Sequence, residues 1–113
     1  MFKWLYLVII FIHGLIHLMG GFNELGLAKI KELSGKTLLS VSGNMQTILG
    51  VTWFIAVAMF LISAFALITN QQWWKSITIA SVIISQVLIL IWWPDAKWGT
   101  IANILIIIGM FFI

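Results

Sequence analysis

The sequence predicts an all-α integral membrane protein, a bundle of four transmembrane helices in a single domain that covers residues 1–113. First, 63% of the residues are hydrophobic and 8% are charged, and a soluble domain of that composition could not cover its surface with polar groups. Second, the chain divides into four apolar segments with polar connections. Third, six of the seven tryptophans lie near the ends of these segments, where indole rings reach the lipid headgroups.

The first apolar segment covers about residues 3–22, which is long enough to cross a bilayer. Lys3 before an apolar stretch resembles a signal peptide, but the stretch is too long and no small-residue cleavage site follows it. We therefore interpret the segment as a retained helix. In the loop that follows, Leu27, Ile30 and Leu33 recur at helical spacing among lysines. This pattern favours a short amphipathic helix lying in the membrane interface, with a solvated loop as the alternative.

The other three segments cover about residues 45–68, 74–93 and 96–113. A polar turn at residues 70–72 joins the second segment to the third. Pro94 is expected to end the third helix and Asp95 to cap the fourth. The fourth segment is short and ends without a polar anchor. We therefore expect the chain to be the N-terminal part of a longer protein.

Charge and cysteine content exclude several classes of function. The net charge of +3 comes from six lysines that are spread along the chain, so no basic patch predicts binding to nucleic acid. Cysteine is absent, which excludes disulfides, thiolate metal sites and thiol redox chemistry. The partner that the composition predicts is the lipid bilayer.

The candidate functional residues are two histidines in the first apolar segment. His13 and His17 lie one helical turn apart, and Gly20 and Glu24 follow on the same face. Ionisable side chains are costly inside a membrane, so they often mark a polar cavity or a ligand site. The alternative is that each histidine makes a hydrogen bond to a neighbouring helix, as polar residues in membrane bundles do.

Two kinds of ligand are consistent with this face. A histidine pair four residues apart can chelate a divalent metal, and a single imidazole can ligate haem. The residues between His13 and His17 lack the glutamate of the zinc-protease signature, which argues against a metalloprotease and leaves no complete catalytic site. A polar pocket that includes His13, His17, Glu24, Gln86 and Asn103 would instead hold a quinone or a lipid between the first and third helices.

Two sequence stretches, HGLIHLMG at residues 13–20 and PDAKWGTIAN at residues 94–103, resemble those of small bacterial four-helix membrane proteins, broadly of the DoxX type. The resemblance implies a multi-pass protein of the bacterial inner membrane with links to respiratory or redox complexes. It assigns no function to any residue.

Three functional hypotheses follow. In the first, the chain is an accessory or scaffold subunit without enzymatic activity, which packs against a larger membrane protein or a second copy of itself. In the second, it is a haem- or metal-binding redox protein that uses His13 and His17. In the third, it binds a quinone or lipid within the membrane.

Overall fold

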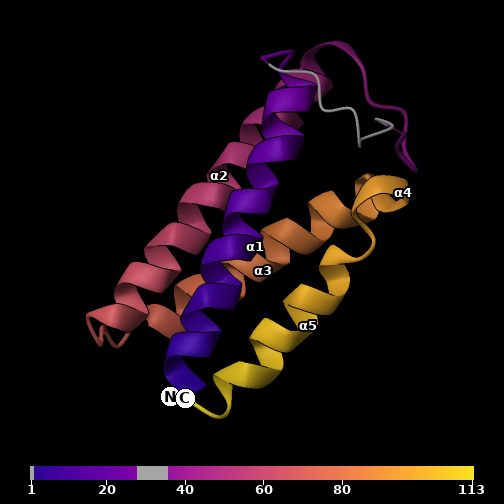
Figure 1. Ribbon diagram of the computed structural model, residues 1–113. Coiled ribbons are helices and arrows are strands. Elements are labelled where there is room, and N and C mark those ends of the chain that lie inside the picture. Colours follow the sequence, from indigo (N-terminus) through magenta and orange to yellow (C-terminus); the bar gives the residue numbers. More distant parts are fainter. Residues whose placement is uncertain (1, 28–35) are drawn as a thin grey trace.

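The computed structural model describes residues 2–27 and 36–113, and these form helices joined by turns, without any strand (Figure 1). The helices are α1 (Phe2–Glu24), α2 (Gly43–Ile68), α3 (Trp74–Ile91), α4 (Trp93–Ala96) and α5 (Gly99–Met110). The all-helical prediction is confirmed. The turn between α2 and α3 includes the predicted polar residues 70–72, and Asn70 there accepts a hydrogen bond from Lys3 at 2.9 Å.

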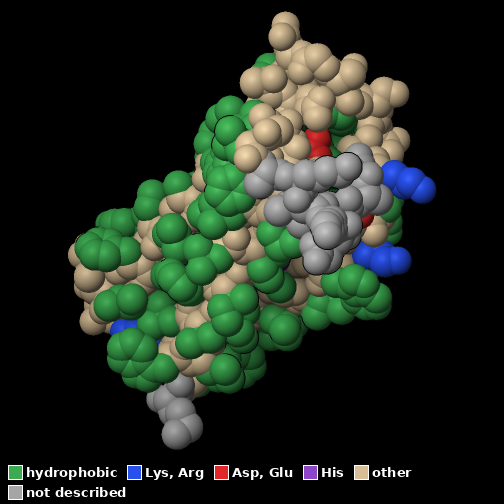
Figure 2. Space-filling model, turned by 45° about the horizontal axis from the view of Figure 1, so that its top comes forward, with side chains coloured by type: hydrophobic (Ala, Val, Ile, Leu, Met, Phe, Trp, Pro, Cys, Tyr) green, Lys and Arg blue, Asp and Glu red, His purple; other side chains and the backbone are tan. Residues whose placement is uncertain are grey.

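By length and composition, α1, α2 and α3 can each cross a bilayer. The molecule is 42 Å long and about half as wide, which exceeds the ~30 Å hydrocarbon core of a bilayer. Large apolar side chains such as Phe65 and Ile83 are more than half exposed on its sides. Figure 2 shows hydrophobic side chains over the helical body and charged ones towards its ends. The prediction of a multi-pass membrane protein is therefore confirmed.

Glycines let α1 pack closely against α2. A Cβ atom at Gly14 would lie 2.7 Å from Cβ of Phe60, and one at Gly20 would lie 2.5 Å from the Trp53 ring. Small residues permit this approach, which provides much of the packing between helices in a membrane. As a result, the Trp53 indole lies directly against the backbone of α1.

The fourth apolar segment differs from the prediction of one helix over residues 96–113. The short turn α4 ends at its first residue, and the helix of this segment is α5, which begins only at Gly99, has 12 residues and is about 18 Å long. Among the described residues, three helices are therefore long enough to span the membrane individually. The predicted cap is wrong, because Asp95 lies inside α4 and Trp98 is the residue that precedes α5. The separate turn α4 arises at Pro94, because proline disfavours continuation of α3 but is tolerated in the first turn of α4.

The end of α5 returns to the start of α1, so that both termini lie at the same end of the molecule (Figure 1). The Tyr6 hydroxyl donates to the carbonyl oxygen of Ile106 at 2.7 Å, and the rings of Phe2 and Phe112 are 6.2 Å apart. Towards the other end, α1 separates from α3 and α4 (Figure 1). The bundle is thus closed near its termini and open at the opposite end.

The described parts of the connection between α1 and α2, residues 25–27 and 36–42, lie at this open end. The backbone N–H of Leu38 donates to the carbonyl of Ile91 at 2.8 Å, and Val41 packs against the cluster around Trp53 and Trp92. The predicted amphipathic segment falls largely on residues 28–35, which lie outside the described residues.

Candidate functional site

The two histidines lie on the buried stripe of α1. Its buried residues recur every three or four positions, which is the helical period, and are Tyr6, Leu7, Ile10, His13, Gly14, His17 and Gly21. His13 is 5% exposed and His17 is 2% exposed. A spacing of four therefore points both imidazoles into the bundle, with ring centroids 4.8 Å apart.

His17 connects α1 to α3. Its Nδ1 lies 2.7 Å from the carbonyl oxygen of His13, and because a carbonyl only accepts, Nδ1 carries the hydrogen. In the neutral ring Nε2 is then an acceptor, which matches the Ser85 hydroxyl at 2.7 Å as its donor. The backbone of α1 thus fixes the tautomer of His17, and the α3 serine satisfies the other nitrogen.

Asn103 on α5 connects this pair to the rest of the bundle. Its Oδ1 accepts from Nε2 of His13 at 2.8 Å. Its amide nitrogen donates to Ser85 at 3.1 Å and to Oε1 of Gln86 at 3.0 Å. Gln86 in turn donates to Thr100 at 3.0 Å. These bonds form one network that joins α1, α3 and α5, and we call it the histidine network.

Three of the four imidazole nitrogens of the histidine network are hydrogen-bonded to protein groups. Both nitrogens of His17 and Nε2 of His13 are already hydrogen-bonded, so chelation of a metal by the pair would require breaking some of these bonds. Within residues 2–27 and 36–113, no group of three or more histidines and carboxylates could hold a metal ion. The metal and haem hypotheses stay predictions, and the observed bonds match the interhelical alternative.

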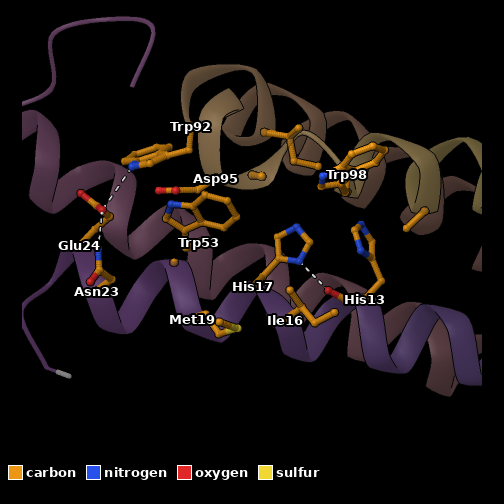
Figure 3. Close-up of a pocket in the computed structure, with 15 residues that line it drawn as sticks. His13, Ile16, His17, Met19, Asn23, Glu24, Trp53, Trp92, Asp95 and Trp98 are labelled. Atoms are coloured by element: carbon orange, nitrogen blue, oxygen red, sulfur yellow. Dashed lines mark hydrogen bonds between the residues drawn. The ribbon is translucent and has the colours of Figure 1, made fainter. Parts of the chain in front are cut away.

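A cavity of about 420 Å³ lies beside the histidine network, at the open end of the bundle (Figure 3). Its walls come from α1, α4 and the start of α5, with contributions from α2 and α3. The residues that line it are His13, Ile16, His17, Met19, Gly20, Asn23, Glu24, Trp53, Ile89, Trp92, Asp95, Ala96, Trp98, Gly99 and Ala102. The sequence predicts a pocket between the first and third helices, and of α3 only Ile89 lines this cavity among the described residues. The cavity opens instead where α1 and α5 separate.

The inner and outer limits of the cavity differ in character. His13 and His17 lie at its deep end, while Glu24 and Asp95 lie at the end near the helix termini (Figure 3). Ile16 and Trp98 are 53% and 71% exposed on α1 and just before α5. The cavity is therefore bordered by side chains that face the surroundings of the bundle.

Glu24 holds the outer end together. Its carboxylate accepts hydrogen bonds from Trp92 Nε1 at 3.2 Å, from Asn23 at 3.2 Å and from Gln46 at 3.3 Å. Glu24 thus joins the end of α1 to the start of α2 and the end of α3, as a structural residue of the cavity wall.

Trp53 carries the unsatisfied group of the site. The residue is 6% exposed, and its indole Nε1–H is buried without a hydrogen-bond partner among the described residues. Its ring lines the cavity between His17 and Trp92, at 5.3 Å and 5.5 Å between ring centroids. A buried donor without a partner costs about 1–3 kcal/mol. In a native protein such a group calls for an explanation.

The structure brings together the sequence-predicted residues in two sets. His13, His17, Gln86 and Asn103 share the histidine network, whereas His13, His17 and Glu24 line the cavity. Sequence reasoning missed Trp53, although it is the one tryptophan distant from the segment ends. Its place inside an apolar segment, away from the membrane interface, was the signal that could have identified it.

No family model matches the chain, and no curated protein or solved structure is significantly similar to it. The resemblance to DoxX-type proteins therefore stays a prediction.

Proposed function

We propose that this protein binds a small lipophilic molecule in the cavity between α1 and α5. The observation that carries the proposal is the cavity itself, whose volume of about 420 Å³ lies in the range of ligand pockets, ~300–1,000 Å³. Most of its lining is apolar or aromatic, with a few polar groups at the two ends. That combination is typical of sites for small organic ligands.

The route into the cavity supports a ligand that arrives from the membrane. Its border passes between Ile16 and Trp98, which are both exposed on the sides of the bundle. A molecule dissolved in the bilayer reaches this border by lateral diffusion. A water-soluble ligand would instead have to pass the outer end, where Glu24 is already engaged in three hydrogen bonds.

A cavity-filling variant tests the proposal. Ala102 lines the cavity, so Ala102→Phe places a ring in the space that the ligand needs. Ala58 is exposed on α2, so Ala58→Phe makes the same change on the lipid-facing surface and is the matched control. Each protein is purified in mild detergent and extracted for mass spectrometry. We expect a small lipophilic molecule at near-stoichiometric yield with the wild type and Ala58→Phe, and its loss with Ala102→Phe. Bulk lipid alone in all three extracts would contradict the proposal.

We further propose that α4 and α5 together make the fourth crossing of a four-helix bundle in the bacterial inner membrane. The contacts of Tyr6 with Ile106 and of Phe2 with Phe112 support a fourth crossing, because they bring the end of α5 back to the N-terminal end. The accessory-subunit hypothesis, with a membrane protein partner or a second copy, stays a prediction beside the binding function. Blue native electrophoresis of solubilised membranes tests it.

A further inference from the structure

One nitrogen of the histidine pair, Nδ1 of His13, has no hydrogen-bond partner among the described residues. Among the buried and half-buried residues that the structure describes, Trp53 Nε1 is the one side-chain polar atom that is both inaccessible and unpaired. Nδ1 of His13 is therefore accessible, and the space that His13 lines is the cavity. A Cβ atom at Gly99, in the cavity wall, would lie 3.5 Å from Cε1 of His13, the ring carbon next to Nδ1.

The histidine network determines whether this nitrogen donates or accepts, and the chain of bonds starts at His17. Its Nδ1 donates to the carbonyl of His13, so in the neutral ring Nε2 accepts the one hydrogen of the Ser85 hydroxyl. Ser85 can then only accept from Asn103. The side-chain nitrogen of Asn103 lies 3.1 Å from the Ser85 hydroxyl oxygen and is the donor.

The orientation of Asn103 in turn fixes the ring of His13. Because the amide nitrogen of Asn103 points to Ser85 and Gln86, its oxygen faces Nε2 of His13 at 2.8 Å. An amide oxygen only accepts, so Nε2 of His13 carries the hydrogen. In the neutral ring Nδ1 is then an acceptor. The deep end of the cavity thus offers a lone pair that pairs with a hydrogen-bond donor.

A hydroxyl group is the donor that fits this end of the cavity. The side chains of Ile16, Ile89 and Ala102 in the lining are apolar, and both nitrogens of His17 are engaged. A donor hydrogen buried there costs free energy unless it is hydrogen-bonded, and Nδ1 of His13 supplies the acceptor. A carbonyl or ether oxygen would instead place an acceptor against an acceptor.

Building on the proposed binding function, we infer that the ligand is a lipophilic alcohol or phenol whose hydroxyl group donates a hydrogen bond to Nδ1 of His13. The hydroxyl lies at the deep end of the cavity, and the apolar part of the ligand extends towards the border between Ile16 and Trp98. His13 is then the residue that distinguishes a hydroxyl compound from an ether or a hydrocarbon of the same shape.

Three probes with the same ring system test the inference. 2-Naphthol carries a hydroxyl donor, 2-methoxynaphthalene keeps the oxygen without the donor, and 2-methylnaphthalene has no oxygen. A flat ring suits walls that include Trp92 and Trp98. Binding is measured by equilibrium dialysis against nanodiscs that hold the protein, and empty nanodiscs correct for partition of each probe into lipid.

His13→Phe keeps a ring at this position and removes Nδ1. Gln72→Phe is the matched control, because Gln72 is exposed in the turn between α2 and α3 and lies outside the cavity. The readout is the ratio of the affinities for 2-naphthol and 2-methylnaphthalene, since a change in the shape of the cavity alters both affinities together. We expect a ratio of about ten in the wild type and in Gln72→Phe, the scale of one hydrogen bond, and similar affinities for the two probes in His13→Phe. 2-Methoxynaphthalene should bind no more tightly than the hydrocarbon.

Solid-state NMR of protein labelled with ¹³C and ¹⁵N in its two histidines observes the bond directly. Carbon–nitrogen correlations show which ring nitrogen carries the hydrogen, and we expect Nε2 in His13 and Nδ1 in His17, so the two rings are distinguished by tautomer. 2-Naphthol should move the Nδ1 signal of His13 upfield, as an acceptor nitrogen does when it gains a hydrogen bond. Nε2 of His17, which Ser85 already engages, should stay almost unchanged.

The results that would overturn the inference differ in what they say of the binding function. Equal affinity for the three probes, with all of them blocked by Ala102→Phe, refutes the bond to His13 and leaves the binding function standing. A hydrogen on Nδ1 of His13 in the wild type does the same. Absence of binding by all three probes refutes the hydroxyl ligand, and the extraction experiment then decides on the binding function separately. If His13→Phe does not fold, the comparison of probes and the ¹⁵N shift in the wild type still decide the inference.

Discussion

Asn103 is the residue on which the histidine network converges, and its replacement by leucine tests whether that network stabilises the bundle. Leucine has a similar size but can make none of the bonds from Asn103 to His13, Ser85 and Gln86. Hydrogen bonds between membrane helices contribute about 0.6 kcal/mol on average and about 1.7 kcal/mol at most. Three lost bonds therefore predict that Asn103→Leu lowers the free energy of unfolding by about 2–5 kcal/mol.

Reversible unfolding in mixed micelles of dodecylmaltoside and SDS, followed by tryptophan fluorescence, measures this change. Asn44→Leu at the exposed start of α2 makes the same chemical change outside the bundle and is expected to leave the unfolding free energy almost unchanged. If Asn103→Leu is as stable as the control, the network does not stabilise the fold. The reasoning that connects α1, α3 and α5 through it would then be wrong.

Two further predictions concern the same helices. Gly14→Leu places side-chain atoms where Phe60 approaches within 2.7 Å, and we expect it to destabilise the bundle by at least about 1–3 kcal/mol; an unchanged unfolding midpoint would show that α1 and α2 do not pack this closely. A double-mutant cycle of His17→Leu and Ser85→Ala should give a coupling energy of about 0.6–1.7 kcal/mol. Strictly additive single effects would mean that the 2.7 Å bond does not contribute in the membrane.

The helical spans could be predicted from the sequence because they depend on local composition. Apolar runs and interface tryptophans placed α1 and α2 to within two residues, and α3 was predicted to end two residues too late. The fourth segment was mispredicted because its helix begins only at Gly99, after the separate turn α4 around Pro94, and this start depends on backbone geometry. Composition measures how well a segment partitions into lipid, but it does not reveal a break between α4 and α5.

The site was predictable only in part. The spacing of His13 and His17 placed both on one buried face, and Gln86 and Asn103 were recognised as buried amides that need partners. Which groups pair could not be predicted, since the bond between His13 and Asn103 joins residues 90 positions apart. The cavity was beyond sequence reasoning because it results from the angle between helices.

The histidine network and the cavity depend on each other through that angle. In a membrane, apolar surface gains little from leaving lipid, so helices separate unless specific contacts hold them together. Near the termini Tyr6 holds α1 to α5, and at mid-depth the network does so through His13 and Asn103. Beyond this point, α1 and the start of α5 have no comparable polar contact among the described residues, and the space between them becomes the cavity. The histidines therefore set the depth at which the cavity ends. Replacing the histidines should therefore change ligand binding by altering the depth of the cavity, even if neither imidazole bonds to the ligand.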